Sequence, residues 1–579
     1  MLAKTDLSSI VCSTITGQAR ELEGGQRGLF FVFESSNSKI APVKCPYVVL
    51  PLATGYTALN GGFTHLARSA KAQHFDVDLA REWLRECDGK HGIECRGARL
   101  RSPRTELRLI DIDAQCIVAG SPSNRYAALS YVWGSVKPPV LRRENAYLLA
   151  MKGCLRGLPL PQTILDTMNV CRQLGIRYLW VDSLCIIQDD EDDVLDQVEQ
   201  MDVIYRGAYL TIINTTGDNC KSPIMSVSQP RDAIQETTTI DGMAVGTVFL
   251  RVRDDILKSK WASRGWTLQE YALSYRSLIF TPKGMFFSCS EGIRREDMTG
   301  YWTKNLSRTQ RYMFPIVLDC AIANKVDTEV LRQVYAPLVT NFTKREVTYV
   351  EDILHAFKGI TKALTPSLKR FEWGVPAQSA DHMQFVLCWS RPGPMERYEE
   401  YPSWSWAGWR TPVGDQDIPS AGGVHFLTSK QADAIQRMGD VYRPFKTEVS
   451  TTLYKGEIAP RVDFAGRFNE MIHLKTYLAP INASTHQAFA EWVAAKEDAS
   501  DKRPTIYDYV KTFAKREALA WIEEATLCLL IADAADFLIA LPVEQVDEDE
   551  VYRRIGNPIF LHPRVWEAYK PRAQELFLA

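Results

Sequence analysis

Short apolar runs alternate with helix-spaced apolar positions through the middle of the chain. Residues 126–133, 178–187 and 209–213 are three such runs, and each has the composition of a buried strand. Residues 164–174 carry apolar side chains at intervals near 3.6 residues, which predicts a helix that ends at Gly175. Strands that alternate with helices predict an α/β domain built on a central parallel sheet.

The flanking regions have less regular patterns. Residues 107–112 form a short extended run near the end of an N-terminal module, and helical spacing returns near residues 330–342 and 352–364. Aromatic side chains alternate along residues 401–409, which predicts a strand against a core, and residues 525–531 predict another strand. We therefore expect mixed α+β regions around a central α/β domain, with the chain divided into residues 1–113, 114–300, 301–440 and 441–579.

The overall charge argues against a general affinity for nucleic acid or for an anionic membrane. The sequence has 68 Lys and Arg residues against 70 Asp and Glu residues, a net charge of -2. The densest basic stretch, from Arg96 to Arg108, favours a solvated linker over a phosphate-binding track. A DNA-binding regulator is a third interpretation, and it would require salt-sensitive binding of nucleic acid.

Targeting signals and disulfide bonds are not indicated. Lys4 and Asp6 interrupt the first residues before an apolar run of signal-peptide length, and prolines and glycines break the longest uncharged stretch, between Lys44 and Arg68. The 13 cysteines are odd in number, are scattered and contain no Cys-x-x-Cys pair, which is typical of a reducing compartment. We expect a cytoplasmic protein without a membrane span.

Cys87, His91 and Cys95 form the one metal-like cluster in the sequence. Tetrahedral zinc sites normally use four ligands, and the pattern around these three residues shows no fourth. An ordinary helix end is therefore the preferred interpretation. We predict no metal site, and zinc binding by these three residues stays open.

Several common catalytic systems are missing from the α/β region. No histidine occurs between His91 and His355, so Ser130, Ser183 or Cys185 would need a base from elsewhere in the chain to act as a nucleophile. No Gly-x-x-x-x-Gly-Lys or Gly-x-Gly-x-x-Gly motif follows a predicted strand, which argues against the usual nucleotide cradles. The carboxylates are therefore the remaining candidates for catalytic side chains in this region.

Glu270 lies on a predicted helix among apolar positions. It shares a helix face with Trp266, four residues before it, and with Leu273, three residues after it. Such a carboxylate is either an edge residue paired with Arg264 or Arg276, or a functional group held beside an aromatic wall in a cleft. The sequence leaves both interpretations open.

Asp182 is the second carboxylate of interest, because it lies near the carboxyl end of a predicted parallel strand. Open α/β sheets bind ligands at that edge, although helix capping or loop bracing is the more common role of such a residue. Tyr131, Trp133 and Gly134 end the first strand and should face the same edge of the sheet. Aromatic rings there suit a planar ligand, or equally a packed loop.

Three ordered segments resemble the fungal heterokaryon incompatibility (HET) domain. They are residues 128–134 (ALSYVWG), 178–188 (YLWVDSLCIIQ) and 264–270 (RGWTLQE), and residues 402–407 (PSWSWA) resemble an aromatic segment often found downstream in such proteins. The resemblance covers about residues 126–289 and implies non-self recognition and regulated death of fused fungal cells. HET domains are more remotely similar to TIR domains, which implies a TIR-like, flavodoxin-like parallel sheet.

The similarity to TIR domains also implies a site. Some TIR domains cleave NAD, and residues 263–270 resemble the TIR helix whose Ser, Trp and Glu arrangement carries the catalytic carboxylate. Glu270 would be that carboxylate, and it would stabilise the oxocarbenium character that builds on the ribose as nicotinamide leaves. The chain would then be an NAD glycohydrolase with NAD as substrate and no resident cofactor. The side chains implied around the substrate are Tyr131, Trp133, Gly134, Asp182, Gln188 and Trp266.

A non-catalytic alternative comes from the same resemblance. Other TIR domains only assemble signalling complexes, and this domain would then act through its helical faces and loops on a second copy or on the protein of an incompatible allele. Glu270 separates the two interpretations. An assembly module tolerates Gln at this position, whereas an oxocarbenium-stabilising site does not.

Overall fold

A computed structural model of the chain divides into two compact units, Met1–Ala321 and Ile322–Ala579. The finer division at residues 113, 300 and 440 stays a prediction. The residues that the structure describes are 12–22, 26–35, 43–51, 67–70, 74–91, 95, 107–121, 124–231, 235, 237–240, 243–248, 252–299, 326–377, 385–387, 389–391, 396–410, 423, 424, 426, 451–454, 471–481, 526–534, 537–547, 551–555, 559–561 and 572–578.

The first unit is built on a large mixed sheet. Among the described residues it has eight strands in the order β13-β12-β11-β8-β6-β7-β4-β5. The neighbours β7, β6, β8 and β11 run parallel, and the strands outside them are antiparallel. The strands are Leu107–Asp111 (β4), Cys116–Gly120 (β5), Tyr126–Ser130 (β6), Tyr178–Trp180 (β7), Leu210–Asn214 (β8), Arg276–Phe280 (β11), Met285–Cys289 (β12) and Gly292–Arg295 (β13).

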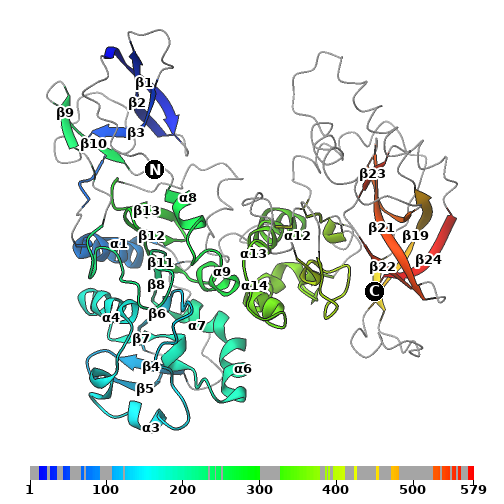
Figure 1. Cartoon of the computed structure of the whole chain (residues 1–579), viewed down its shortest axis with the longest axis horizontal. Coiled ribbons are helices and arrows are strands. Elements are labelled where there is room, and N and C mark those ends of the chain that lie inside the picture. Colours follow the sequence, from blue (N-terminus) through cyan, green and yellow to red (C-terminus); the bar gives the residue numbers. More distant parts are fainter. Residues whose placement is uncertain are drawn as a thin grey trace. The chain divides into compact units, whose positions relative to one another are not determined.

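Helices cover both faces of this sheet (Figure 1). Helices α1 (Val77–Lys90) and α4 (Gln162–Leu174) pack together on one face, and α6 (Glu191–Glu199), α7 (Met201–Gly207) and α9 (Gly265–Ala272) lie on the other. Gly175 adopts the left-handed conformation and ends α4, as the sequence predicts. Shorter helices are α3 (Ala146–Leu149), the 3-10 helix Cys154–Gly157, α5 (Asp182–Cys185) and α8 (Val252–Leu257).

Two expectations about this sheet are wrong. The sheet is not parallel throughout, because antiparallel hairpins extend both of its edges. The apolar run 178–187 is not one strand either. Strand β7 ends at Trp180, and the backbone N–H groups of Leu184 and Cys185 then bond to the Val181 carbonyl and close a helical turn. A short buried helix and a buried strand have the same continuous apolar pattern, so periodicity cannot separate them.

The order of the parallel strands determines where a ligand site can form. Strands β6, β7, β8 and β11 follow one another in the chain, but β7 lies on one side of β6 and β8 lies on the other. The connections that follow the neighbouring strands β6 and β8 therefore leave in opposite directions, toward β7 and toward β11, and they diverge between the carboxyl ends of these two strands. Ligands of α/β sheets bind outside the carboxyl ends of the strands at such a point.

A smaller sheet in the same unit combines early strands with part of the polar insertion that the sequence shows after residue 213. Its strand order is β1-β2-β3-β10-β9. The strands are Cys12–Leu22 (β1), Gln26–Ser35 (β2), Val43–Pro51 (β3), Thr237–Ile240 (β9) and Met243–Val248 (β10). The insertion therefore contributes strands as well as loops.

The second unit contains helices near both predicted segments and a second large sheet. The helices are Asp327–Val330 (α12), a π-helical turn Leu331–Tyr335, Ala336–Phe342 (α13) and Asp352–Leu368 (α14). Short strand pairs are Phe371–Glu372 (β14) with Val375–Pro376 (β15), and Glu396–Arg397 (β16) with Trp409–Arg410 (β17). The sheet consists of Thr451–Tyr454 (β18), Met471–Ile481 (β19), Thr526–Ala534 (β20), Phe537–Asp547 (β21), Val551–Arg554 (β22), Ile559–Leu561 (β23) and Arg572–Leu578 (β24).

The Trp-rich segment 401–409 is buried, but it is not the predicted strand, because only its last residue, Trp409, belongs to one (β17). Its centre is a 3-10 helix, Trp406–Gly408, and the Ser405 hydroxyl accepts a hydrogen bond from the Ala407 N–H at its start. Trp406 packs edge-on against Phe342 and Phe357. The alternation of aromatic residues therefore reflects burial in a compact turn.

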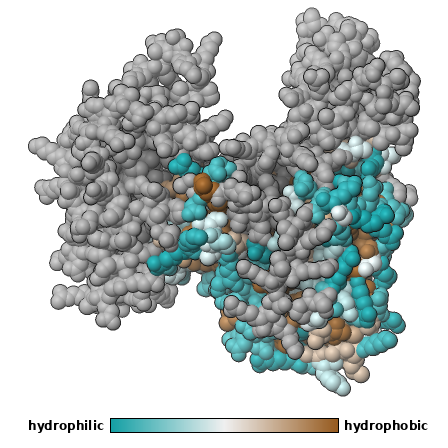
Figure 2. All heavy atoms as spheres, turned by 180° about the vertical axis from the view of Figure 1, so that it is seen from behind, coloured by the Kyte–Doolittle hydropathy of each residue, from teal (hydrophilic) through white to brown (hydrophobic). Residues whose placement is uncertain are grey.

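The described surface is largely hydrophilic on the side that Figure 2 shows. Three exposed apolar side chains are close in sequence in and after α3, where Tyr147 is 84%, Leu148 55% and Met151 50% exposed. No helix in the described part of the chain has the length and apolar character needed to cross a membrane.

Candidate functional site

The residues marked by the resemblance meet at the carboxyl ends of β6 and β7. Ser130 is the last residue of β6, Asp182 is the first residue of α5 after β7, and Glu270 lies on α9, which contacts β6. The three segments that resemble the HET domain therefore converge on the part of the sheet where its connections diverge. Their order in the sequence alone does not establish this convergence.

Glu270 is at the centre of a buried chain of hydrogen bonds. The Trp261 Nε1–H donates to Ser130 Oγ at 2.7 Å, and Ser130 Oγ in turn donates to Glu270 Oε2. The Tyr205 hydroxyl interacts with the same carboxylate and is 3.2 Å from the Leu129 carbonyl oxygen. Glu270 is 8% exposed and Ser130 is fully buried. The carboxylate is thus held by polar partners in surroundings that exclude most water.

The electrostatic environment makes Glu270 a weak acid. Burial raises the pKa of Glu270 from its usual 4.5 to about 7, because the charged form loses its hydration. Hydrogen bonds from Ser130 and Tyr205 and the charge of Arg264 lower this pKa, whereas the charge of Asp182 raises it. Burial also raises the pKa of Asp182. Two interacting carboxylates with raised pKa values are more common at functional sites than elsewhere.

Hydroxyl groups fix both ends of the short helix that carries Glu270. At its start, Thr267 Oγ1 donates to the carbonyl oxygens of Trp261 and Arg264 at 2.7 Å and 2.9 Å. At its end, Ser274 Oγ donates to the Glu270 carbonyl oxygen at 2.6 Å. The backbone of Glu270 is therefore held independently of its side chain.

Asp182 braces its loop, as one of the two sequence interpretations expects. Its Oδ2 accepts a hydrogen bond from Trp133 Nε1 at 2.8 Å, and its Oδ1 accepts one from the Ser183 backbone N–H at 2.7 Å. The Tyr131 hydroxyl donates to Ser183 Oγ at 3.3 Å. These contacts join the segment after β6 to the start of α5, so Tyr131 and Trp133 take part in loop packing beside Glu270.

Gln188 and Trp266 have less central positions. The Gln188 side-chain amide donates to the carbonyl oxygens of Asp182 and Ile186 at 3.1 Å and 3.3 Å, which braces the turn after α5. Trp266 is half-buried in the first turn of α9, four residues before Glu270. The contribution of these two side chains to ligand binding stays a prediction.

Gly134 is required by the backbone at the end of the segment that follows β6. Its φ is +70°, and a Cβ atom there would lie 2.4 Å from Asn219 Cβ. We expect Gly134→Ala to lower the free energy of unfolding by about 1 to 3 kcal/mol, measured by denaturant unfolding. Gly153→Ala is the matched control, because Gly153 has a φ of +88° but no atom within 4 Å of its Cβ position. Equal losses in the two variants would contradict a cost from the Asn219 contact.

Ser130→Ala tests the hydrogen-bond chain. The variant removes one buried hydrogen bond from the Trp261 Nε1–H and one from Glu270, so we expect a loss of about 1 to 3 kcal/mol in the free energy of unfolding. The pKa of Glu270 should rise further, because Ser130 lowers it. Unfolding measured across pH 5 to 9 detects both effects. Ser183→Ala is the control, and the same alkaline shift in that variant would argue against a specific role of Ser130.

The structure distinguishes between the partners that the sequence offers for Glu270. Arg264 interacts electrostatically with Glu270, whereas Arg276 forms an ion pair with Asp88 at 2.8 Å. Trp261 and Tyr205 were not predicted, because in the sequence they look like ordinary core aromatic residues.

A second correction concerns the cysteine and histidine cluster. The fourth side chain that the sequence does not show is Cys289, the last residue of β12. Cys87, His91, Cys95 and Cys289 are all buried, and they come together in the first unit. The prediction that a fourth ligand is missing is therefore wrong.

The segment that contains the Glu270 cluster is similar to known proteins. Residues 126–270 match the family described as heterokaryon incompatibility protein (HET). The chain contains a HET domain. Over 135 residues it is 29% identical to heterokaryon incompatibility protein 6, OR allele, of Neurospora crassa, a match that spans 20% of this chain and 19% of the Neurospora protein. No solved structure matches the chain. The HET match begins at the first residue of β6, ends at Glu270 and includes both Ser130 and Asp182.

Proposed function

We propose that this chain acts in heterokaryon incompatibility, and that its HET domain triggers regulated cell death by cleaving NAD. The match to the Neurospora incompatibility protein supports the biological role. The observation that carries the chemical proposal is Glu270, a buried carboxylate that is bonded to Ser130 and lies within electrostatic reach of Asp182. Burial and the charge of Asp182 raise the pKa of Glu270 although the charge of Arg264 opposes them, and carboxylates perturbed in this way are more common at functional sites than elsewhere.

The proposed reaction breaks the bond between nicotinamide and ribose. The bonding electrons leave with nicotinamide, which departs as a neutral base, and the positive charge moves onto the ribose as an oxocarbenium-like centre. Water then attacks this centre and releases one proton to the solvent. Ionised Glu270 stabilises this charge in a low-dielectric site. In this proposal Trp133 or Trp266 stacks on a ring of NAD, Tyr131 and Gly134 border the site, and Asp182 or Gln188 bonds to ribose or amide groups.

The strand order supports a TIR-like interpretation of the domain. The parallel strands lie in the order β7-β6-β8-β11, in which the second strand in the chain comes before the first. Flavodoxin-like sheets begin with this order and bind ligands where the first and third strands diverge. In this chain those strands are β6 and β8, and Ser130 is the last residue of β6.

The burial of Glu270 leads us to propose that access to it is controlled. At 8% exposure, the side chain can reach a ribose only after the surrounding loops rearrange. Self-association is one source of such a rearrangement, and it would make the rate rise faster than protein concentration. The direct test is nicotinamide release from NAD by the full-length protein at several concentrations, with the mass of the assemblies measured in parallel. Activity that stays absent in fully assembled protein would reject the enzymatic proposal.

One surface feature favours the alternative proposal of a non-catalytic assembly module. Tyr147, Leu148 and Met151 expose apolar surface in and after α3, and exposed apolar clusters often mark protein contacts. On this proposal Tyr147→Glu with Leu148→Glu abolishes self-association and cell death, whereas Glu270→Gln leaves both unchanged. Loss of cell death in the Glu270 variant, with self-association retained, would contradict the alternative.

A further inference from the structure

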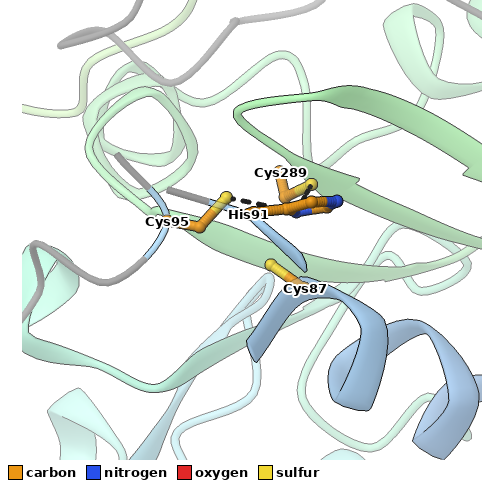
Figure 3. A group of neighbouring side chains, drawn as sticks. All are labelled: Cys87, His91, Cys95 and Cys289. Carbon is orange, nitrogen blue, oxygen red and sulfur yellow. Dashed lines mark hydrogen bonds between the residues drawn. The ribbon is translucent and has the colours of Figure 1, made fainter. Parts of the chain in front are cut away.

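Three sulfur atoms and one imidazole nitrogen converge on a single point at the edge of the large sheet. Figure 3 shows His91 between Cys95 and Cys289, with Cys87 projecting toward them from the end of α1. The Nδ1 atom of His91 is 3.5 Å from Cys95 Sγ and 3.6 Å from Cys289 Sγ. All four potential ligand atoms lie within 4.8 Å of one another, and all four residues are buried.

These separations fit the edges of a zinc tetrahedron. Zinc bonds of about 2.3 Å to sulfur and about 2.05 Å to nitrogen, at a tetrahedral angle, place ligand nitrogen and sulfur about 3.6 Å apart and two sulfurs about 3.8 Å apart. The two observed distances from His91 agree with the nitrogen–sulfur edge. Small shifts of the remaining sulfur atoms would complete the tetrahedron.

The fold holds the ligands in place through contacts that do not involve them. Helix α1 packs on β12 through the stacked rings of Trp83 and Phe287, whose centroids are 6.0 Å apart. An ion pair at 2.7 Å between Glu86 and Arg294 joins the same helix to β13. The end of α1 is therefore fixed beside the end of β12, where Cys289 lies. A site held in this way requires little rearrangement to bind a metal.

The surroundings also suit the charge of such a centre. One Zn²⁺ with three thiolates and a neutral imidazole carries one net negative charge. The buried guanidinium of Arg276 interacts with Cys87 and donates to the Cys95 carbonyl oxygen at 3.1 Å. The Ser290 hydroxyl lies within hydrogen-bond distance of Cys95 Sγ. Polar groups that contact the ligands in this way are typical of the outer shell of metal sites.

We propose that Cys87, His91, Cys95 and Cys289 bind one Zn²⁺ as a closed structural site. Four protein ligands leave no coordination position for water or substrate, which is the arrangement of structural rather than catalytic zinc. The ion would cross-link α1 and Cys95 to β12. This inference is independent of the proposed NAD chemistry, because none of its residues contributes to the Glu270 cluster.

The test is the metal content of the full-length protein purified under reducing conditions without chelators. We expect about one zinc per chain by inductively coupled plasma mass spectrometry. Cys289→Ser and His91→Gln should each lower zinc retention on dialysis more than about tenfold. Cys171→Ser is the matched control, because Cys171 is a buried thiol on α4 outside the cluster, and it should keep its zinc.

Cobalt substitution keeps the proposal testable if the ligand variants do not fold. The wild-type protein loaded with one equivalent of Co²⁺ should show the visible absorption of a tetrahedral cobalt centre with thiolate ligands. Folded, reduced wild-type protein that retains no zinc and gives no such spectrum would overturn the proposal. A mass lower by two hydrogen atoms, with two of the three cysteines joined in a disulfide, would also overturn it.

Discussion

Replacing Glu270 with Gln should lower the rate of nicotinamide release from NAD by about 100- to 1,000-fold. This range is typical for the loss of one preorganised group that stabilises charge in a transition state. Gln has nearly the same shape as Glu and can still accept the hydrogen bond from Ser130, so the substitution removes charge and little else. The measurement is the release rate at fixed protein and NAD concentrations, with folding confirmed by circular dichroism.

The surface variant Glu191→Gln is the matched control for this experiment. Glu191 is an exposed carboxylate in the first turn of α6, so the same chemical change there should leave the rate unchanged. Comparable loss in both variants would show a general effect of charge on the domain. A Glu270→Gln variant that keeps full activity would exclude the carboxylate role.

The pH profile adds a second readout of the same group. Burial raises the pKa of Glu270 to about 7, so half of the molecules carry a protonated, uncharged side chain near neutral pH. Only the ionised form stabilises an oxocarbenium ion. The rate should therefore rise with pH between about 6 and 8 and then level off. A rate that falls over this interval would contradict the proposed role of Glu270.

Local patterns were sufficient to predict the helix that ends at Gly175, the helix that carries Glu270 and the positions of three of the four parallel strands. The helix that carries Glu270 extends over Gly265–Ala272 and so overlaps the segment 263–270 that the sequence marks. Asp182 lies just beyond the carboxyl end of β7, because this strand ends earlier than the predicted strand 178–187. These features depend on residues that are close in sequence, and the spacing of apolar residues is a good predictor of such local structure.

The remaining features depend on contacts between distant residues. Ser130 and Glu270 are separated by 140 positions, and Cys289 lies 198 positions after His91. No local pattern encodes either contact, because both form only when β6 and β12 take their places in the sheet. The short helix α5 was missed for a different reason, since its apolar side chains are buried on all sides and show no amphipathic period.

The raised pKa of Glu270 should also appear as a pH dependence of stability. In the unfolded chain the carboxyl group ionises near 4.5, whereas in the folded chain it ionises near about 7. Between these values the folded protein binds the proton more tightly than the unfolded chain does. The contribution of this group to stability is therefore greatest at acidic pH and falls as pH rises from about 4.5 to about 7.

The expected size of this effect is about 2 to 3 kcal/mol between pH 5 and pH 8, because each unit of pKa difference corresponds to about 1.4 kcal/mol. Glu270→Gln cannot ionise, so it should lack this component and gain stability relative to the wild-type protein as pH rises. Hydrogen–deuterium exchange of peptides that cover α9 and β6 measures the local free energy of opening in both proteins. The difference between the two proteins isolates Glu270, because all other titrating groups are shared. Parallel pH dependences would mean that the carboxylate is not desolvated in the folded protein, which would remove the physical basis for its proposed activity.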